Sequence, residues 1–140
     1  MYRRILAFTL LLLLQSGCTL MGTKVLNIKG NWTLFAVDGQ TVAMAGTKKQ
    51  AGFTLNLGDN GVASGRVACN SWRASYQQEA ATLMLSQAMS TKAYCLLQSD
   101  ELKAIERAFP SALNQGQIET AGDKELIILS RDGKRWVFHR

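Results

Sequence analysis

Histidine and proline are almost missing from this chain, which has one of each, with three cysteines, among 140 residues. A single histidine excludes most zinc enzymes and most acid–base mechanisms that depend on an imidazole. The apolar share of 47% excludes a disordered or collagen-like chain, and the length suits one domain rather than two. The net charge is +6, and it is two units lower without Arg3 and Arg4, which lie in a segment that we expect to be removed. Such a charge is weak evidence for an acidic partner.

The short motifs of common catalytic and binding sites are missing as well. No phosphate-binding Gly-x-x-x-x-Gly-Lys sequence occurs, residues 59–61 are too short for a calcium loop, and residues 61–65 place a serine at the wrong spacing for a hydrolase nucleophile. His139 has no identifiable nucleophile or orienting partner, and the basic residues are too dispersed for a nucleic-acid site. We therefore expect no catalytic residues, no metal, no cofactor and no nucleic-acid partner.

The amino terminus is typical of a secretory signal. Arg3 and Arg4 precede an apolar run over residues 5–14, which is shorter than the roughly 20 residues of a membrane-spanning helix. Residues 14–18, Leu-Gln-Ser-Gly-Cys, are similar to the processing signal of bacterial lipoproteins, although Gln15 stands where that signal has an apolar residue. In such proteins the cysteine is acylated and the chain is cut before it. The alternative is a conventional secreted protein in which Cys18 is incidental.

The lipoprotein interpretation divides the chain into a signal peptide at 1–17, an acylated tether at 18–29 and a domain at 30–140. Several acyl chains on Cys18 would hold the protein firmly, since each buried methylene contributes roughly 0.8 kcal/mol. Thr19, in place of an aspartate, favours the outer membrane by the same resemblance. We expect the domain to face the periplasm.

The two remaining cysteines form an even pair in an oxidising compartment. A bridge between Cys69 and Cys95 would close a loop of about 27 residues and stabilise the fold by roughly 3–4 kcal/mol. The alternative is two buried free thiols, and a metal site with the distant His139 is not expected. Asn70, directly after Cys69, suits a structural corner because a short amide can bond to nearby backbone, and a binding role is the alternative.

Alternating apolar residues and turn sequences predict a mainly β (α+β) domain of seven or eight antiparallel strands. Ser99 is a plausible helix N-cap, and Leu102, Ile105 and Phe109 follow at helical spacing. Pro110 is expected to end the helix or to kink it before a last turn that contains Leu113. Residues 86–97 show no clear pattern and are expected to be irregular. A small barrel or strongly curved sheet, with this single helix across one opening, would remove the sheet edges. The expected strands lie at 32–37, 53–57, 62–68, 71–77, 82–85, 118–120, 126–129 and 136–139, and residues 41–44 are a candidate for one further short strand.

Three features carry a resemblance to a known family: Gly30-Asn31-Trp32, the Cys69-Asn70 pair after a glycine-containing hairpin, and Thr91 followed by Cys95. Together they resemble the META domain of HslJ-like heat-shock lipoproteins over residues 30–140. The chain departs from the family at Ala68, where glycine is usual, and at Lys92, where arginine is common. The resemblance implies a β-barrel in an envelope protein linked to stress response or drug tolerance, with no established catalytic residues.

We therefore expect a non-enzymatic envelope lipoprotein that binds another envelope protein or helps the surface to tolerate stress. Two alternatives stay open. One is a pilot lipoprotein that escorts an outer-membrane component of a secretion system. The other is a carrier that holds a small apolar ligand inside the barrel.

Overall fold

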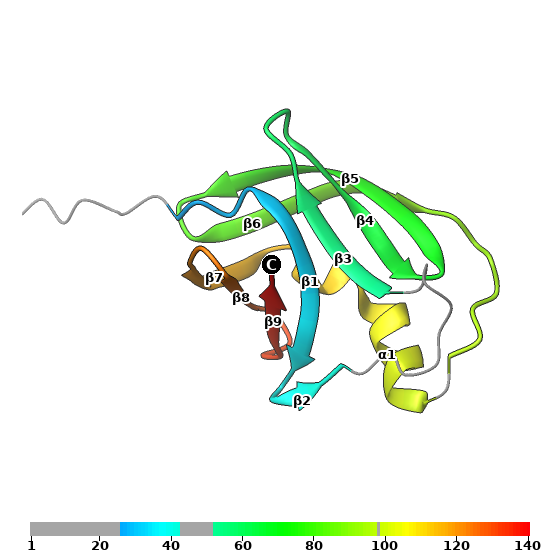
Figure 1. Ribbon diagram of the computed structural model, residues 1–140. Helices are drawn as coiled ribbons and strands as arrows, with labels where there is room; N and C mark the ends of the chain where they lie inside the picture. The colour runs from blue at the N-terminus through cyan, green and yellow to red at the C-terminus, as the bar shows by residue number, and fades with distance from the viewer. Residues whose placement is uncertain (1–25, 43–51, 98) are drawn as a thin grey trace, which may run out of the picture.

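The computed structural model describes residues 26–42, 52–97 and 99–140. Its strands form one antiparallel sheet in the order β2-β1-β3-β4-β5-β6-β7-β8-β9, and β1 also pairs with β9, which closes all the strands except β2 into an eight-stranded barrel (Figure 1). The short β2 forms a hairpin with the end of β1. The strands are β1 (Gly30–Val37), β2 (Gln40–Thr41), β3 (Gly52–Leu57), β4 (Val62–Ala68), β5 (Asn70–Glu79), β6 (Thr82–Ser90), β7 (Gly116–Ala121), β8 (Glu125–Leu129) and β9 (Arg135–His139).

Alternating burial explains why the strands curl into a barrel. In β1, Trp32, Leu34 and Ala36 are buried, whereas the residues between them face outward. Closure occurs where Leu34 lies opposite Phe138 in β9, and a closed barrel leaves few unpaired edges. The predicted small antiparallel barrel is confirmed, in its closed form.

The helix α1 (Asp100–Ala108) begins and ends as predicted. The Ser99 hydroxyl oxygen accepts a hydrogen bond from the Leu102 backbone N–H at 3.2 Å, and two acidic residues in the first turn complement the helix dipole. The helix ends at Phe109 before Pro110, and a short 3-10 helix, η1 (Ser111–Leu113), follows.

Phe109 seals the end of the barrel that α1 covers. Its ring lies edge-on to Phe53 and Trp72, with centroids 6.0 and 5.6 Å away, and tilted against Trp136 and Phe138. Such edge-to-face contacts are favourable packing geometries for aromatic rings. The residue that directly follows α1 therefore packs its ring among the aromatic side chains at this end of the core.

The sequence-based expectation was wrong for the second half of β6. This strand continues from Thr82 to Ser90, although we expected it to end at Leu85. Residues 86–90 are exposed, so the apolar alternation that identifies a half-buried strand stops at Leu85 while the pairing with β5 continues. For the expected short strand at 41–44, pairing is seen at Gln40–Thr41, and residues 43 and 44 lie outside the described part of the chain.

Candidate functional site

The corner between β4 and β5 is the starting point of the candidate site. Val67 lies opposite Asn70, so Ala68 and Cys69 make the turn. Ala68 has a φ of +54°, a left-handed conformation that glycine adopts without steric cost. This backbone requirement gives a physical reason for glycine as the usual residue at that position in the family that the sequence resembles.

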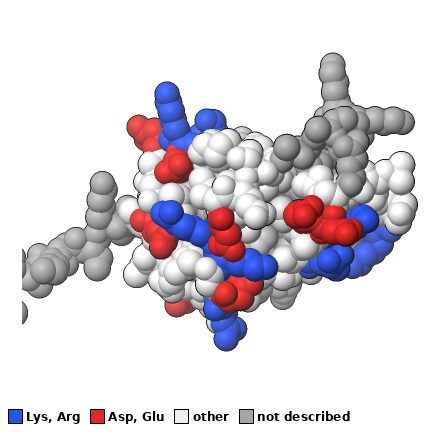
Figure 2. All heavy atoms as spheres, turned by 90° about the horizontal axis from the view of Figure 1, so that it is seen from below, with Lys and Arg blue, Asp and Glu red and all other residues white. Residues whose placement is uncertain are grey.

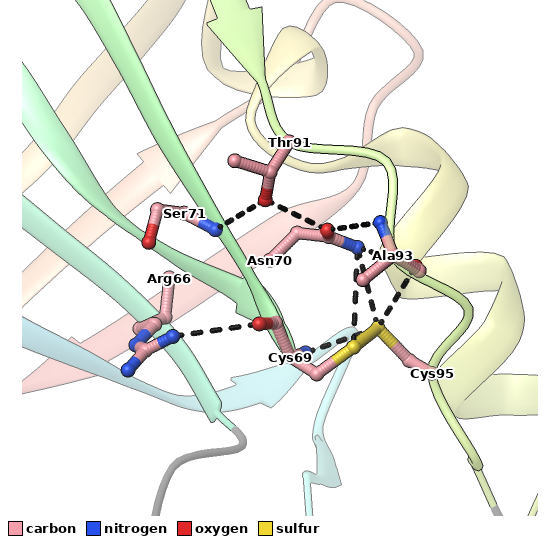
Figure 3. The surroundings of a disulfide bond; sticks show 7 residues. All are labelled: Arg66, Cys69, Asn70, Ser71, Thr91, Ala93 and Cys95. Carbon is pink, nitrogen blue, oxygen red and sulfur yellow. Dashed lines mark hydrogen bonds between the residues drawn. A yellow bond between two sulfur atoms is a disulfide. The ribbon is translucent and has the colours of Figure 1, made fainter.

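A disulfide joins this corner to the segment between β6 and α1 (Figure 3). Cys69 and Cys95 are bridged, with their Cα atoms 5.5 Å apart. The predicted bridge is therefore present, and the alternative of two free thiols does not apply. Its effect is to hold residues 91–97, which have no regular secondary structure, against the end of the sheet.

Asn70 makes a second connection between the same two segments. Its side-chain oxygen accepts hydrogen bonds from the Ala93 backbone N–H and the Thr91 hydroxyl, both at 2.7 Å, and its amide nitrogen donates to the Ala93 carbonyl at 2.9 Å (Figure 3). The Thr91 hydroxyl oxygen in turn accepts from the Ser71 backbone N–H. Asn70 is buried, so these bonds satisfy a polar group that would be costly to bury alone. The partners lie 21 and 23 residues further along the chain, so Asn70 ties the corner to residues 91–93 instead of bonding to the backbone of its own turn.

An open groove of about 870 Å³ lies between residues 88–94 and residues 106–111, and we call it the β6 groove. One side is the end of β6 with the segment braced by Asn70 and the disulfide, and the other is the last turn of α1 with the start of η1. Met89 and Tyr94 line it and are 69% and 89% exposed. Nearby Leu96 is 82% exposed but does not line it. Apolar side chains held at the surface in this way are typical of binding sites.

The charged side chains of the described residues are mixed in sign. Figure 2 shows Lys and Arg interspersed with Asp and Glu over the face seen from below. His139 lies 3.4 Å from Glu125 and stacks on Phe35, so its contacts are those of a surface strand residue. Five exposed or half-exposed ion pairs occur among the described residues, and each contributes little to stability. They are Lys29–Asp59, Lys103–Asp100, Lys134–Asp132, Arg135–Glu119 and His139–Glu125.

The described residues show neither a cluster of metal ligands nor a helix that could span a membrane. Within residues 26–42, 52–97 and 99–140, no three His, Cys, Asp or Glu side chains gather as a metal ion would require. No helix in the described part of the chain is both long and apolar enough to cross a membrane. Cys18, the expected acylation site, lies outside the described residues.

The META domain model matches residues 24–140. The chain belongs to the META domain family. Its fold is similar to the NMR structure of a protein from Burkholderia xenovorans, with a TM-score of 0.61, 23% identity and coverage of 84% of this chain and 85% of that one. A second NMR structure has the same TM-score at 14% identity, covering 79% of this chain and 87% of the other. No curated protein sequence matches the chain.

Within this META domain, the residues that fix the segment after β6 could be identified from the sequence, whereas those that line the β6 groove could not. Cys69, Asn70 and Cys95 were singled out, and the structure brings them together. Met89 and Tyr94 were not, because they lie where the sequence shows no periodicity. Their signal in the sequence is apolar residues in a stretch that no predicted strand or helix would bury.

Proposed function

We propose that this META-domain protein is a lipid-anchored envelope module that works by binding another envelope protein and catalyses no reaction. Membership of the META family supports an envelope-related role at the level of the family. The observation that carries the proposal is the β6 groove. Its exposed Met89 lies near the end of β6, and its exposed Tyr94 lies on the segment that the disulfide and the buried Asn70 fix. A fixed binding surface loses little conformational entropy when a partner docks.

The filled barrel supports surface binding over the carriage of a small apolar ligand. Leu55, Leu83, Leu126 and Ile128 are fully buried, and Phe109 fills the end beneath α1. A carrier would need several hundred cubic ångströms of internal space for its ligand. In this barrel the space is taken by side chains.

The position of the groove also suits a tethered protein. The Gln78 side chain donates to the Leu26 carbonyl and to the Ala80 carbonyl, which ties the start of the described chain to the β5–β6 turn. From that turn, β6 runs to Ser90 over about 25 Å, at roughly 3.3 Å per residue. Leu26, the first described residue, therefore lies at the Thr82 end of β6, whereas the residues of the groove lie at its Ser90 end. A domain anchored through Cys18 would present the groove away from the membrane.

Cross-linking in intact cells tests the proposal. The full chain, tagged at its carboxyl terminus, is purified after cross-linking, and its partners are identified by mass spectrometry. We expect one reproducible envelope protein, and an acylated amino-terminal Cys18 on the purified chain. A Cys18→Ser variant is the control for anchoring, since it should leave the membrane fraction. Absence of any reproducible partner, or an unmodified Cys18, would contradict the proposal.

Two deletion phenotypes would narrow the role. Increased sensitivity to heat or to antibiotics would support the envelope-stress function that the family suggests. Mislocalisation of an outer-membrane pore would favour the pilot function, for which an open groove could hold the partner's tail.

A further inference from the structure

The second half of β6 has an open edge. β7 pairs with β6 at Thr82 and Leu83 and then separates from it. The next backbone N–H of β6 that is directed away from β5 is that of Leu85. It donates to the Asn114 side-chain oxygen at 2.9 Å. In the described part of the chain no strand lies beside β6 on this side from Leu85 to Ser90. β6 is therefore paired with β7 at its first residues and has an unpaired edge toward its end.

The backbone of Ser90 points toward this open side. The Thr91 N–H bonds to the Ser71 carbonyl at 3.0 Å, so the backbone groups of Thr91 face the β5 side. Neighbouring residues in a strand direct their N–H and C=O groups to opposite sides. The N–H and C=O of Ser90, which lies opposite Trp72 in the register, are thus directed away from β5. They face the side on which the groove lies.

The backbone and the charge of the groove limit which segment can pair with the open edge of β6. A β-bulge at Gln87, with a φ of +54°, interrupts the ladder, so regular pairing is available beyond it, where residues 88–94 line the groove without a break. Lys92 and Arg107 border the groove together with the single carboxylate of Glu106, which leaves a small positive excess. The site therefore offers backbone donors and acceptors, apolar side chains and a weak preference for negative charge.

We propose that the partner protein inserts an extended, neutral or acidic segment into the β6 groove as an added strand. Its backbone pairs with Ser90, and its apolar side chains pack on Met89 and Tyr94. Adding a strand to an open sheet edge is a general mode of peptide recognition, in which backbone bonds give affinity and flanking pockets give selectivity. This inference rests on the proposed function, since it names how the envelope partner is bound.

Peptides selected from a display library of random 12-residue sequences provide the probe. The full chain is purified in detergent, and the binding of each selected peptide is measured by fluorescence anisotropy. Ser90→Pro removes the N–H that faces the groove and leaves the bonds to β5, which is where sheets tolerate proline. We expect it to weaken binding at least about tenfold, the scale of one lost hydrogen bond. The matched control Ser90→Ala keeps the N–H and should bind like the wild type.

A second pair of variants guards against misfolding by the proline. Tyr94→Ala removes an exposed side chain that lines the groove, and Leu96→Ala removes one that does not. We expect weaker binding for the first and unchanged binding for the second. Peptides that bind all four variants like the wild type would overturn the inference. Concentration-dependent self-association that Ser90→Pro abolishes would also overturn it, because a second copy would then be the occupant.

Photo-crosslinking in cells separates this inference from the proposed function. The crosslinker is placed at Tyr94 in the groove or at exposed Arg131 in the β8–β9 turn. Crosslinks to an envelope protein from Tyr94 support both the binding of a strand in the groove and the proposed envelope-binding function. Crosslinks from Arg131 alone would reject the groove and keep the envelope-binding function, whereas no crosslinks from either position would reject both.

Discussion

Asn70 and Ala93 are paired as two peptide groups would be. The Asn70 side-chain oxygen accepts from the Ala93 N–H at 2.7 Å, and its amide nitrogen donates to the Ala93 carbonyl at 2.9 Å. A side chain thus takes the place of a strand neighbour beside a segment that has none in the described structure. The exchange fixes one side of the β6 groove without closing its open edge.

Removing the Asn70 amide should loosen this segment. Asn70→Ala leaves the Ala93 N–H and C=O without their partner, and we expect it to lower the free energy of unfolding by about 2–3 kcal/mol. Urea unfolding followed by tryptophan fluorescence measures the change. The neighbouring exposed Ser71→Ala is the control and should cost less than about 0.5 kcal/mol. Equal unfolding midpoints for the two variants would show that the pairing contributes little.

Reduction of the disulfide should destabilise the protein further. The bridge joins residues 26 apart, and the chain entropy of the unfolded state predicts a loss of roughly 3–4 kcal/mol when it is opened. The measurement is the urea midpoint with and without dithiothreitol. A Cys69→Ala/Cys95→Ala double variant should start at the lower stability and not respond to the reductant. A wild-type midpoint that stays constant after complete reduction would rule the effect out.

The elements with alternating burial could be predicted from the sequence. Trp32 and Leu34 face the core from β1, and Ser99 caps α1, because each choice is determined by neighbours a few residues away. The same reasoning failed for the end of β6, since both faces of residues 86–90 are exposed and leave no alternation.

Contacts between distant segments were beyond the sequence pattern. Helical spacing placed Phe109 on the core side of α1, but its position among the rings of Phe53 and Trp72 depends on how the barrel closes. Likewise, Asn70 could be assigned to a corner, whereas its partner Ala93 lies in a stretch without periodicity. The disulfide followed from counting cysteines, and the groove depends on where β6 and β7 separate.

The turn between β8 and β9 should show a pH response at the acid end. The Ser130 hydroxyl donates to the Asp132 carboxylate at 2.5 Å, and this hydrogen bond lowers the pKa of Asp132 below its usual 3.8. Because the folded pKa is the lower one, the stabilisation is present above pH 3.8 and is lost as the pH falls through the folded value. Ser130→Ala should raise the pKa of Asp132 toward 3.8, as measured by NMR titration of the carboxyl group. If the Asp132 carboxyl titrated at the same pH in the variant, the Ser130 hydrogen bond would not be the cause of the lowered pKa.

Gly65 in β4 should not tolerate a side chain. A Cβ at this position would lie 2.0 Å from the Thr54 carbonyl oxygen and 2.7 Å from its carbon, so the backbone of β3 would have to move away from β4. The same oxygen accepts a hydrogen bond from the Trp72 indole at 3.1 Å, which the movement would also strain. We expect Gly65→Ala to cost at least about 2 kcal/mol in urea unfolding and to change the tryptophan fluorescence of the folded state. Gly52→Ala, where a Cβ meets nothing within 4 Å, is the control, and equal stability of the two variants would contradict the close packing of β3 on β4.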